Sequence, residues 1–147
     1  MIVRRATLED LPTLSGLFDE YRQSYGERPN LQQSADFLEQ RFKNAESIIF
    51  VNVMGEVLTG FILLYRGFSS IRCRSYYVLD DVYVSPAFRR QGAARQLIDT
   101  AILFANQEQA VKIWVDTPKD NYQSHQLYQS MGFKATDQYM SFQRHLS

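Results

Sequence analysis

Hydrophobic residues recur at helical spacing in three parts of the chain. Every third or fourth position is apolar between residues 11 and 21, between 31 and 42, and between 97 and 105, which places these side chains on one face of a helix. A shorter helix is expected over 123–131, because Gly132 supplies a stop. Thr7 is a suitable N-cap for the first helix. A break at 26–30, containing Pro29, separates the first helix from the second.

Runs of β-branched, aromatic and aliphatic residues predict the strands. These runs occupy residues 2–5, 48–53, 57–65, 76–84, 111–116 and, with a polar turn inside it, 133–146. The resulting order is β-α-α-β-β-β-α-β-α-β, which indicates an α/β fold with about six to seven strands. No repeat, low-complexity stretch or linker interrupts residues 1–147, so one domain is expected.

Composition excludes several classes of function. Lys plus Arg and Asp plus Glu number 16 each, so no basic field is available for nucleic acid. Cys73 is the single cysteine; it excludes an internal disulfide and suits a reducing compartment. No signal-peptide core is present, and no apolar run reaches the roughly 20 residues of a membrane span. A cytoplasmic protein without a membrane partner is expected. His125 and His145 are isolated, so no metal site is expected.

The segment Arg89-Arg90-Gln91-Gly92-Ala93-Ala94 lies between a predicted strand and a predicted helix. The first N–H groups of such a helix lack intrahelical partners and favour an anion. Gly92 and Ala94 allow a phosphate to approach the backbone closely, and Arg89 adds a planar guanidinium. The segment is neither a Walker A loop nor a dinucleotide fingerprint, because the required lysine and further glycines are absent.

Together with the preceding strand this segment reads Val-x-Val-Ser-Pro-x-x-Arg-Arg-Gln-Gly-x-Ala, starting at Val82. It resembles the pyrophosphate-binding signature of the GNAT superfamily of N-acetyltransferases, Arg/Gln-x-x-Gly-x-Gly/Ala. The resemblance implies a twisted mixed sheet with helices on both faces and acetyl-CoA as cosubstrate. The implied acetyl-CoA contacts in this region are Val82, Tyr83, Val84, Arg89, Arg90, Gln91, Gly92, Ala93, Ala94 and Arg95.

A second motif runs from Asn121 to Phe133 as Asn-x-x-Ser-x-x-Leu-Tyr-x-x-x-Gly-Phe. It resembles the GNAT pattern Asn-x-x-Ala/Ser-x-x-Leu-Tyr-x-x-x-Gly-Phe. The resemblance implies that the Tyr128 hydroxyl protonates the departing CoA sulfur, and that Asn121 and Ser124 lie near the pantetheine arm. Helix capping by Asn121 and core packing by Tyr128 are the structural alternatives.

The adjacent acids Asp80 and Asp81 lie within an apolar strand. Neighbouring strand residues point to opposite faces unless a bulge turns one of them to the other face. A carboxylate within an apolar run requires a hydrogen-bonding or charged partner, or has a functional role. The surrounding sequence resembles the polyamine and diamine acetyltransferase branch. That likeness implies Asp80 as the general base, with water as the alternative, and Asp81 as a contact of the cationic acceptor. The aromatic side chains of Tyr83 and Trp114, which belong to segments expected to border the same cleft, are expected to complete the acceptor pocket.

These patterns together predict an N-acetyltransferase that transfers an acetyl group from acetyl-CoA to a primary amine in a ternary complex. The expected acceptor is a small cationic amine, such as a polyamine, or a lysine-like amine. Two alternatives stay open: a non-catalytic acyl-CoA-binding or sensing domain, and a peptide or histone lysine acetyltransferase. Related small enzymes often dimerise, so a homodimer is also expected.

Overall fold

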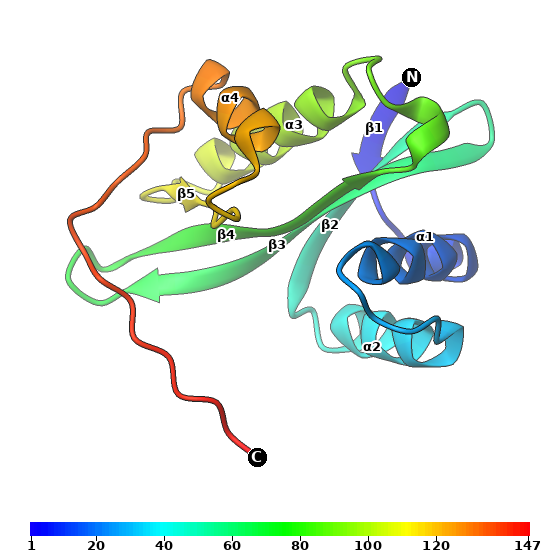
Figure 1. The fold of residues 1–147 in the computed structure, drawn as a ribbon, viewed down its shortest axis with the longest axis horizontal. Helices are drawn as coiled ribbons and strands as arrows, with labels where there is room; N and C mark the ends of the chain where they lie inside the picture. The colour runs from blue at the N-terminus through cyan, green and yellow to red at the C-terminus, as the bar shows by residue number, and fades with distance from the viewer. The chain divides into compact units, whose positions relative to one another are not determined.

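The structure, a computed structural model, describes all residues from Met1 to Ser147. The chain forms two compact units, Met1–Asp116 and Thr117–Ser147. The first unit contains the whole sheet and the first three α-helices (Figure 1).

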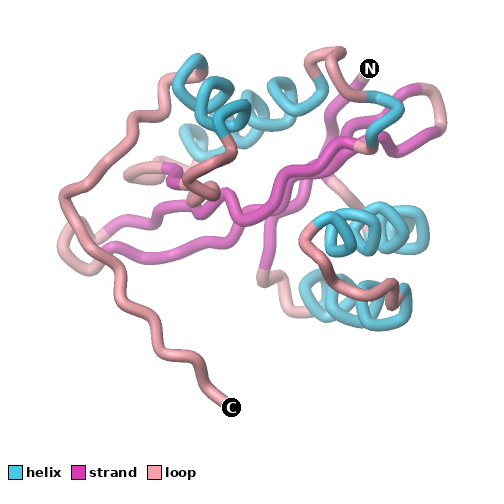
Figure 2. The backbone as a smooth tube through the Cα atoms, viewed as in Figure 1, coloured by secondary structure: helices cyan, strands magenta, loops and turns pink.

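The sheet has five strands in the order β1-β2-β3-β4-β5. The first four pair antiparallel with their neighbours, and the last pair is parallel. Figure 2 shows the long strands β2, β3 and β4 twisting together through the unit. The strand bounds are β1 Ile2–Arg5, β2 Ser47–Met54, β3 Val57–Ser69, β4 Arg74–Val84 and β5 Ile113–Trp114.

Helices cover both faces of this sheet, as the resemblance implied (Figure 1). On one face lie α1 (Leu11–Ser24), which follows a short 3-10 turn, and α2 (Leu31–Lys43). On the other lies α3 (Ala93–Gln107). The core beneath α1 and α2 is formed by buried side chains of the helices and the sheet: Leu14, Leu17, Phe18, Leu38, Ile49, Val51, Phe61, Leu63 and Tyr83.

The second unit contains α4 (Tyr122–Ser130). Asn121 caps this helix, since its side chain accepts a hydrogen bond from the Ser124 N–H. The helix ends at Ser130, Met131 is its C-cap, and Gly132 follows with φ 92°, a left-handed conformation that glycine adopts without strain. The predicted short helix and its glycine stop are confirmed.

The predicted strand over 133–146 is wrong, and the sheet has five strands rather than six to seven. Tyr139, Met140 and Phe142 are 88%, 80% and 89% exposed in an irregular segment. Alternation of apolar residues is not sufficient for a strand, because a strand also requires a neighbouring backbone and a face that excludes water. The strand predicted over 111–116 is likewise shorter, since only Ile113–Trp114 pairs with β4.

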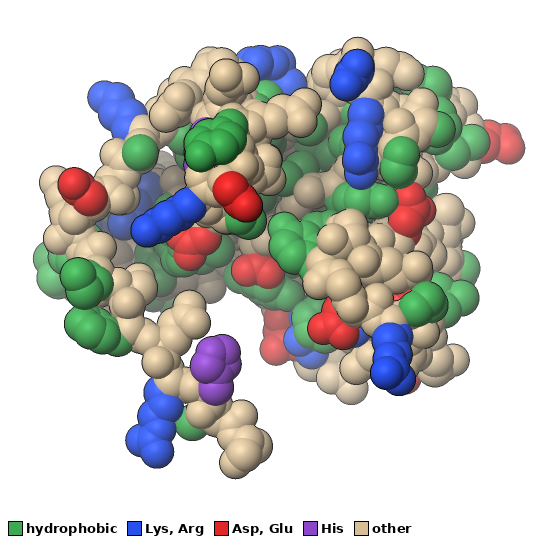
Figure 3. Space-filling view, in the orientation of Figure 1, with side chains coloured by type: hydrophobic (Ala, Val, Ile, Leu, Met, Phe, Trp, Pro, Cys, Tyr) green, Lys and Arg blue, Asp and Glu red, His purple; other side chains and the backbone are tan.

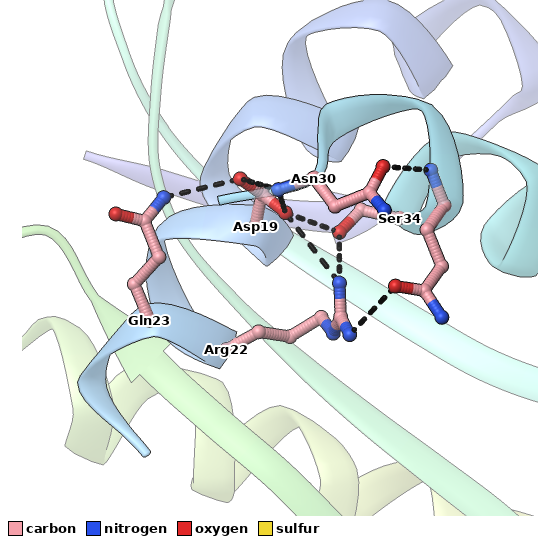
Figure 4. A network of polar contacts seen from close by, with 6 residues as sticks. Asp19, Arg22, Gln23, Asn30 and Ser34 are labelled. Carbon is pink, nitrogen blue, oxygen red and sulfur yellow. Dashed lines mark hydrogen bonds and ion pairs between the residues drawn. The ribbon is translucent and has the colours of Figure 1, made fainter. Parts of the chain in front are cut away.

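A buried carboxylate ties α1 to the start of α2 (Figure 4). Asp19 is 6% exposed and accepts hydrogen bonds from the Ser34 hydroxyl at 2.7 Å, the Asn30 N–H at 3.2 Å and the Gln23 amide at 3.1 Å. The Arg22 guanidinium lies 3.6 Å from the same carboxylate. These contacts, led by the Ser34 hydroxyl, hold the pKa of Asp19 below its ordinary value.

We expect Asp19→Asn to lower the melting temperature at pH 7 by several degrees, because the amide cannot accept all of these hydrogen bonds. A carboxyl whose pKa is depressed on folding stabilises the protein above the unfolded pKa of about 3.9 and loses that effect as pH falls. The difference between wild type and variant should therefore shrink below about pH 4. Thermal unfolding across pH tests this, with the exposed Asp36→Asn as control. A difference that is constant down to pH 2.5 would contradict it.

Candidate active site

An extra residue in β4 turns both adjacent aspartates to the same face of the sheet. Leu64 pairs with Leu79 but Leu63 pairs with Asp81, so Asp80 has no partner on β3. Such a bulge reverses the alternation of side chains along the strand. The neighbouring rings confirm the reversal, because Tyr77 before the bulge packs on Phe104 of α3, whereas Tyr83 after it packs on Tyr21 of α1.

Asp81 is partly buried next to α1. The Tyr21 hydroxyl donates a 2.6 Å hydrogen bond to its Oδ1 atom. Burial raises the pKa of Asp81 to about 7; the charge of Asp80 adds to this effect, while the hydrogen bond from Tyr21 opposes it. Asp80 itself is exposed. Asp81 is therefore a carboxylate whose protonation changes near neutral pH.

Further acidic and aromatic side chains extend this surface, which we call the α1–β4 wall. The Oε1 atom of Glu20 accepts hydrogen bonds from the Tyr83 hydroxyl at 2.9 Å and the Ser85 hydroxyl at 3.0 Å. Burial, and then the Glu20 bond, raise the pKa of Tyr83 to about 12. Burial and the nearby aspartates raise the pKa of Tyr65 to about 12. The wall consists of Glu20, Tyr21, Tyr65, Asp80, Asp81 and Tyr83.

No Lys or Arg forms an ion pair with the three carboxylates of the wall. The ion pairs of the chain instead join Arg4 to Asp10, Arg22 to Asp19, Arg41 to Glu46 and Lys43 to Glu39. Figure 3 shows Lys and Arg side chains interspersed with acidic ones over the viewed surface. The three carboxylates of the wall thus form no ion pair within the chain, although the Arg89 guanidinium lies against the Tyr83 ring.

Beside the wall, one edge of β4 has no strand partner. The pairing with β5 ends at Val78 and Trp114. Toward β3, the Ser85 N–H donates to the Thr59 carbonyl at 2.8 Å. Since alternate residues direct their backbone groups to opposite edges, the backbone groups of Val82 and Val84 are directed at the open edge. An extended ligand can therefore pair with this part of β4 as a strand would.

The turn after β4 leads into α3 through two residues in left-handed conformations. Arg90 has φ 64° and Gly92, the N-cap of α3, has φ 82°. Such a turn makes successive N–H groups converge on an anion. A Cβ atom at Gly92 would meet nothing within 4 Å, so the space in front of this helix end is open. The first backbone N–H groups of α3 face that space without intrahelical acceptors.

Arg89 is held against the end of β4. Its Nε atom donates to the Val84 carbonyl at 2.8 Å, and its guanidinium carbon lies 5.4 Å from the centre of the Tyr83 ring. The buried Asn52 amide donates to the Ala93 carbonyl at 3.4 Å. These contacts fix the guanidinium and the start of α3 relative to the open edge.

The remaining expected residues are found in separate settings. Trp114 is 37% exposed at the end of β5. In the second unit, Tyr128 is 8% exposed and its ring meets Phe133 edge to face at 5.5 Å. Asn121 uses its side-chain oxygen as a cap for α4. The capping and packing roles considered from the sequence are thus real, and they leave the catalytic roles as proposals.

Comparison with known proteins identifies the family. The sequence profile of the acetyltransferase (GNAT) family matches residues 14–133. This chain belongs to that family. An N-acetyltransferase of unassigned role from Bacillus subtilis strain 168, YhfO, is 32% identical over 134 residues, which cover 91% of this chain and 90% of that protein. The acetyltransferase activity expected from the sequence is therefore supported by both the family and its named members.

Two further likenesses concern fold and acceptor chemistry. The crystal structure of a probable acetyltransferase is 35% identical, with a TM-score of 0.95 over 100% of this chain and 99% of that one. An aminoglycoside N(6′)-acetyltransferase type 1 from Acinetobacter haemolyticus is 36% identical over 66 residues, which cover 45% of this chain and 46% of that enzyme. The first likeness extends over the whole fold, whereas the second covers less than half of either chain.

Sequence reasoning missed two side chains of this acetyltransferase that the structure places on the wall. The helical spacing over residues 11–21 places Tyr21 on the buried stripe of the first helix, and no motif includes Glu20. The two residues are recognised by their hydrogen bonds to Asp81 and Tyr83, about sixty positions later. A single sequence carries no information on such long-range contacts. No group of three metal-ligating side chains is arranged around an ion site, and no helix is long and apolar enough to span a bilayer.

The turn before α3 gives a charge-based test of the acetyl-CoA site. Both Asn and Asp tolerate a left-handed backbone better than most residues, so Gly92→Asn and Gly92→Asp differ mainly in charge. We expect Gly92→Asp to weaken CoA binding at least about tenfold more than Gly92→Asn, through repulsion of the pyrophosphate. Added salt should reduce the difference.

Calorimetric titration of both Gly92 variants with CoA measures this effect. Circular dichroism serves as the control for folding, and a carboxylate at a helix N-terminus favours the helix. Equal CoA affinity of the two folded variants would mean that the pyrophosphate lies elsewhere.

Proposed function

We propose that this acetyltransferase transfers the acetyl group of acetyl-CoA to the primary amine of a small cationic acceptor, in a ternary complex without a covalent enzyme intermediate. The observation that carries the proposal is the bulge that brings Asp80 and Asp81 to one face of β4, beside tyrosines and without a cationic partner. Carboxylates next to aromatic faces bind ammonium groups. The acceptor thus supplies a cation for carboxylates that form no ion pair within the chain.

The residues of the first unit fit acetyl-CoA in two respects. The open edge of β4 offers the backbone groups of Val82 and the N–H of Val84 to the amide-bearing pantetheine arm, whereas the Val84 carbonyl accepts from Arg89. The turn from Arg89 to Arg95 presents its N–H groups to the pyrophosphate, with the exposed Arg90 able to add a second cation. When bound, acetyl-CoA supplies the activated acetyl group and a thiolate leaving group.

Asp81 is the member of the acidic pair that we assign as the base. A primary amine with a pKa near 10.4 is almost wholly protonated at pH 7, so its nitrogen must lose a proton before it attacks. A base with a pKa of about 7 is well matched to that step near neutral pH. The adjacent charge of Asp80 raises the proton affinity of Asp81 and attracts the ammonium group.

Tyr128 is proposed as the acid that protonates the departing sulfur, as the family motif implies. A protonated phenol can donate its proton to a developing thiolate. Ser124 and Asn121 are proposed contacts of the pantetheine arm, and Trp114 borders the acceptor. The partial likeness to aminoglycoside N(6′)-acetyltransferases agrees with an amine acceptor.

A turnover screen tests the acceptor class. Purified protein is assayed at pH 8 for thiol release from acetyl-CoA with diamines, polyamines, aminoglycosides, amino acids, and lysine peptides. We expect turnover with small acceptors that carry two or more amines, and KM for these should rise with salt, because attraction to the wall is electrostatic. Turnover confined to lysine peptides would replace the small acceptor by a protein. CoA binding without turnover on any amine would overturn the proposal.

Asp80→Asn and Asp81→Asn are expected to change the kinetics of acetyl transfer in different ways. Asp81→Asn should lower kcat/KM about 100-fold or more and abolish the acidic limb of its pH profile near pH 7, because the proton acceptor is lost. Asp80→Asn should shift that limb to lower pH, since the charge that raises the pKa of Asp81 is removed, and should also raise KM for the amine. Steady-state kinetics from pH 5.5 to 9.5 distinguish these effects.

If Asp80→Asn abolishes the limb and Asp81→Asn does not, then Asp80 is the base, as the sequence resemblance implied. Unchanged CoA affinity in both variants is the control for the acetyl-CoA site. Equal losses that follow a fall in melting temperature would make the pair structural.

We expect Tyr128→Phe to lower kcat by about 10- to 1,000-fold, within or just below the range of acid–base catalysis. Phe retains the ring that meets Phe133, so the melting temperature should change little. Rapid-quench measurement of a single turnover isolates the chemical step. A single-turnover rate within twofold of wild type would show that the sulfur is protonated by another group.

A further inference from the structure

Tyr21 is a side chain of the wall that the family resemblance does not assign. Its hydroxyl reaches Asp81 from α1, across a separation of 60 residues. Its ring is fixed on several sides, with centroid distances of 5.2 to 6.2 Å. The aromatic neighbours are Phe18, Tyr25, Phe61 and Tyr83. The packing of the ring therefore holds the phenol oxygen close to the carboxylate.

We propose that Tyr21 is a positioning residue for acetyl transfer, whose hydroxyl fixes Oδ1 of Asp81 so that Oδ2 takes the proton of the acceptor amine. The inference rests on the proposed role of Asp81 as the base. The ammonium group gives one proton to Oδ2, and the nitrogen lone pair that is freed attacks the thioester carbonyl carbon to form the new C–N bond. The C–S bond breaks, and the sulfur leaves with the electron pair and takes a proton from the proposed acid, Tyr128. The nitrogen loses its second proton to solvent, from which the tyrosine is reprotonated.

The chemistry of the phenol suits this role. Burial, and then the bond to Asp81, raise the pKa of Tyr21 well above its ordinary value. Tyr21 is therefore protonated, and a hydrogen-bond donor, at neutral pH. A donor that bonds to the charged form of a carboxylate favours that form, so Tyr21 opposes the effects of burial and of Asp80 and keeps Asp81 available as a base near pH 7.

Other titratable groups near Asp81 do not replace this hydrogen bond. Asp80 is its neighbour on β4, and Tyr65 of β3 lies near both aspartates. Tyr25, just beyond the end of α1, acts on Tyr21 rather than on Asp81. Arg41 and Glu46 act on Tyr65 from the side of α2. The Tyr83 hydroxyl is already bonded to Glu20, and the Tyr65 hydroxyl makes no hydrogen bond to a carboxylate.

Tyr21→Phe tests the proposal, because it removes the hydroxyl and keeps the ring. We expect the acidic limb of kcat/KM to move up by about one pH unit, as follows from the loss of one hydrogen bond to the charged carboxylate. Activity should fall about tenfold at pH 6 and recover to within about threefold of wild type at pH 9. A loss that is equal at all pH values would overturn the proposal, because it would indicate a packing role. An unmoved profile would overturn it as well.

Tyr65→Phe is the matched control, since it removes a phenol hydroxyl from the same wall without removing a hydrogen bond to Asp81. We expect this variant to leave the position of the limb unchanged. A shift equal to that of Tyr21→Phe would overturn the proposal, because any hydroxyl of the wall would then have the same effect.

Carboxyl ¹³C NMR titration of Asp81 in the free protein provides a readout without turnover. The pKa of Asp81 should be about one unit higher in Tyr21→Phe than in wild type; an equal pKa would overturn the proposal. The pH profile of Asp81→Asn distinguishes the proposed role of Asp81 from the proposed role of Tyr21. If that variant keeps the acidic limb, the assignment of the base fails. If Asp81→Asn loses the acidic limb of kcat/KM and Tyr21→Phe leaves the position of that limb unchanged, Asp81 remains the base and only the proposed role of Tyr21 is wrong.

Discussion

The bulge at Asp80 is the constraint on which the rest of the site depends. One residue without a partner on β3 reverses the alternation of β4, and from that point on Asp81 and Tyr83 face α1 rather than α3. In a regular strand, the two aspartates would lie on opposite faces. The acidic pair, the aromatic wall and the direction of the backbone at the open edge therefore all follow from this local change in register.

Helix α1 has a second role beyond covering the sheet. Its apolar stripe supplies the core, while Glu20 and Tyr21 at its far end bond to Tyr83 and Asp81 of β4. The Asp19 network fixes the same turn of the helix to α2. The docking of α1 therefore also determines the surroundings of the proposed base, Asp81, because the packing that buries Phe18 sets the position of the Tyr21 hydroxyl.

Much of the architecture follows from local patterns in the sequence, because spacing, caps and turns are local properties. Gly92 and Gly132 begin and end helices where expected, and the antiparallel strands lie close to their predicted bounds. The acidic pair was also recognisable, with a bulge as the condition for both aspartates to share a face. The exposed segment after Phe133 and the hydroxyl of Tyr21 were not predictable, because both depend on which distant backbone or side chain is, or is not, nearby.

The short β5 has a consequence for the protein before any ligand binds. Beyond Val78, β4 presents backbone donors and acceptors with no strand beside them, and such an edge is a template for pairing with a strand of another molecule. In the proposed complex, a pantetheine arm paired with Val82 and the Val84 N–H would complete the sheet as a short strand does. Cosubstrate supply would then govern not only turnover but also how readily the protein self-associates, and the concentrated apo protein would be its most aggregation-prone form.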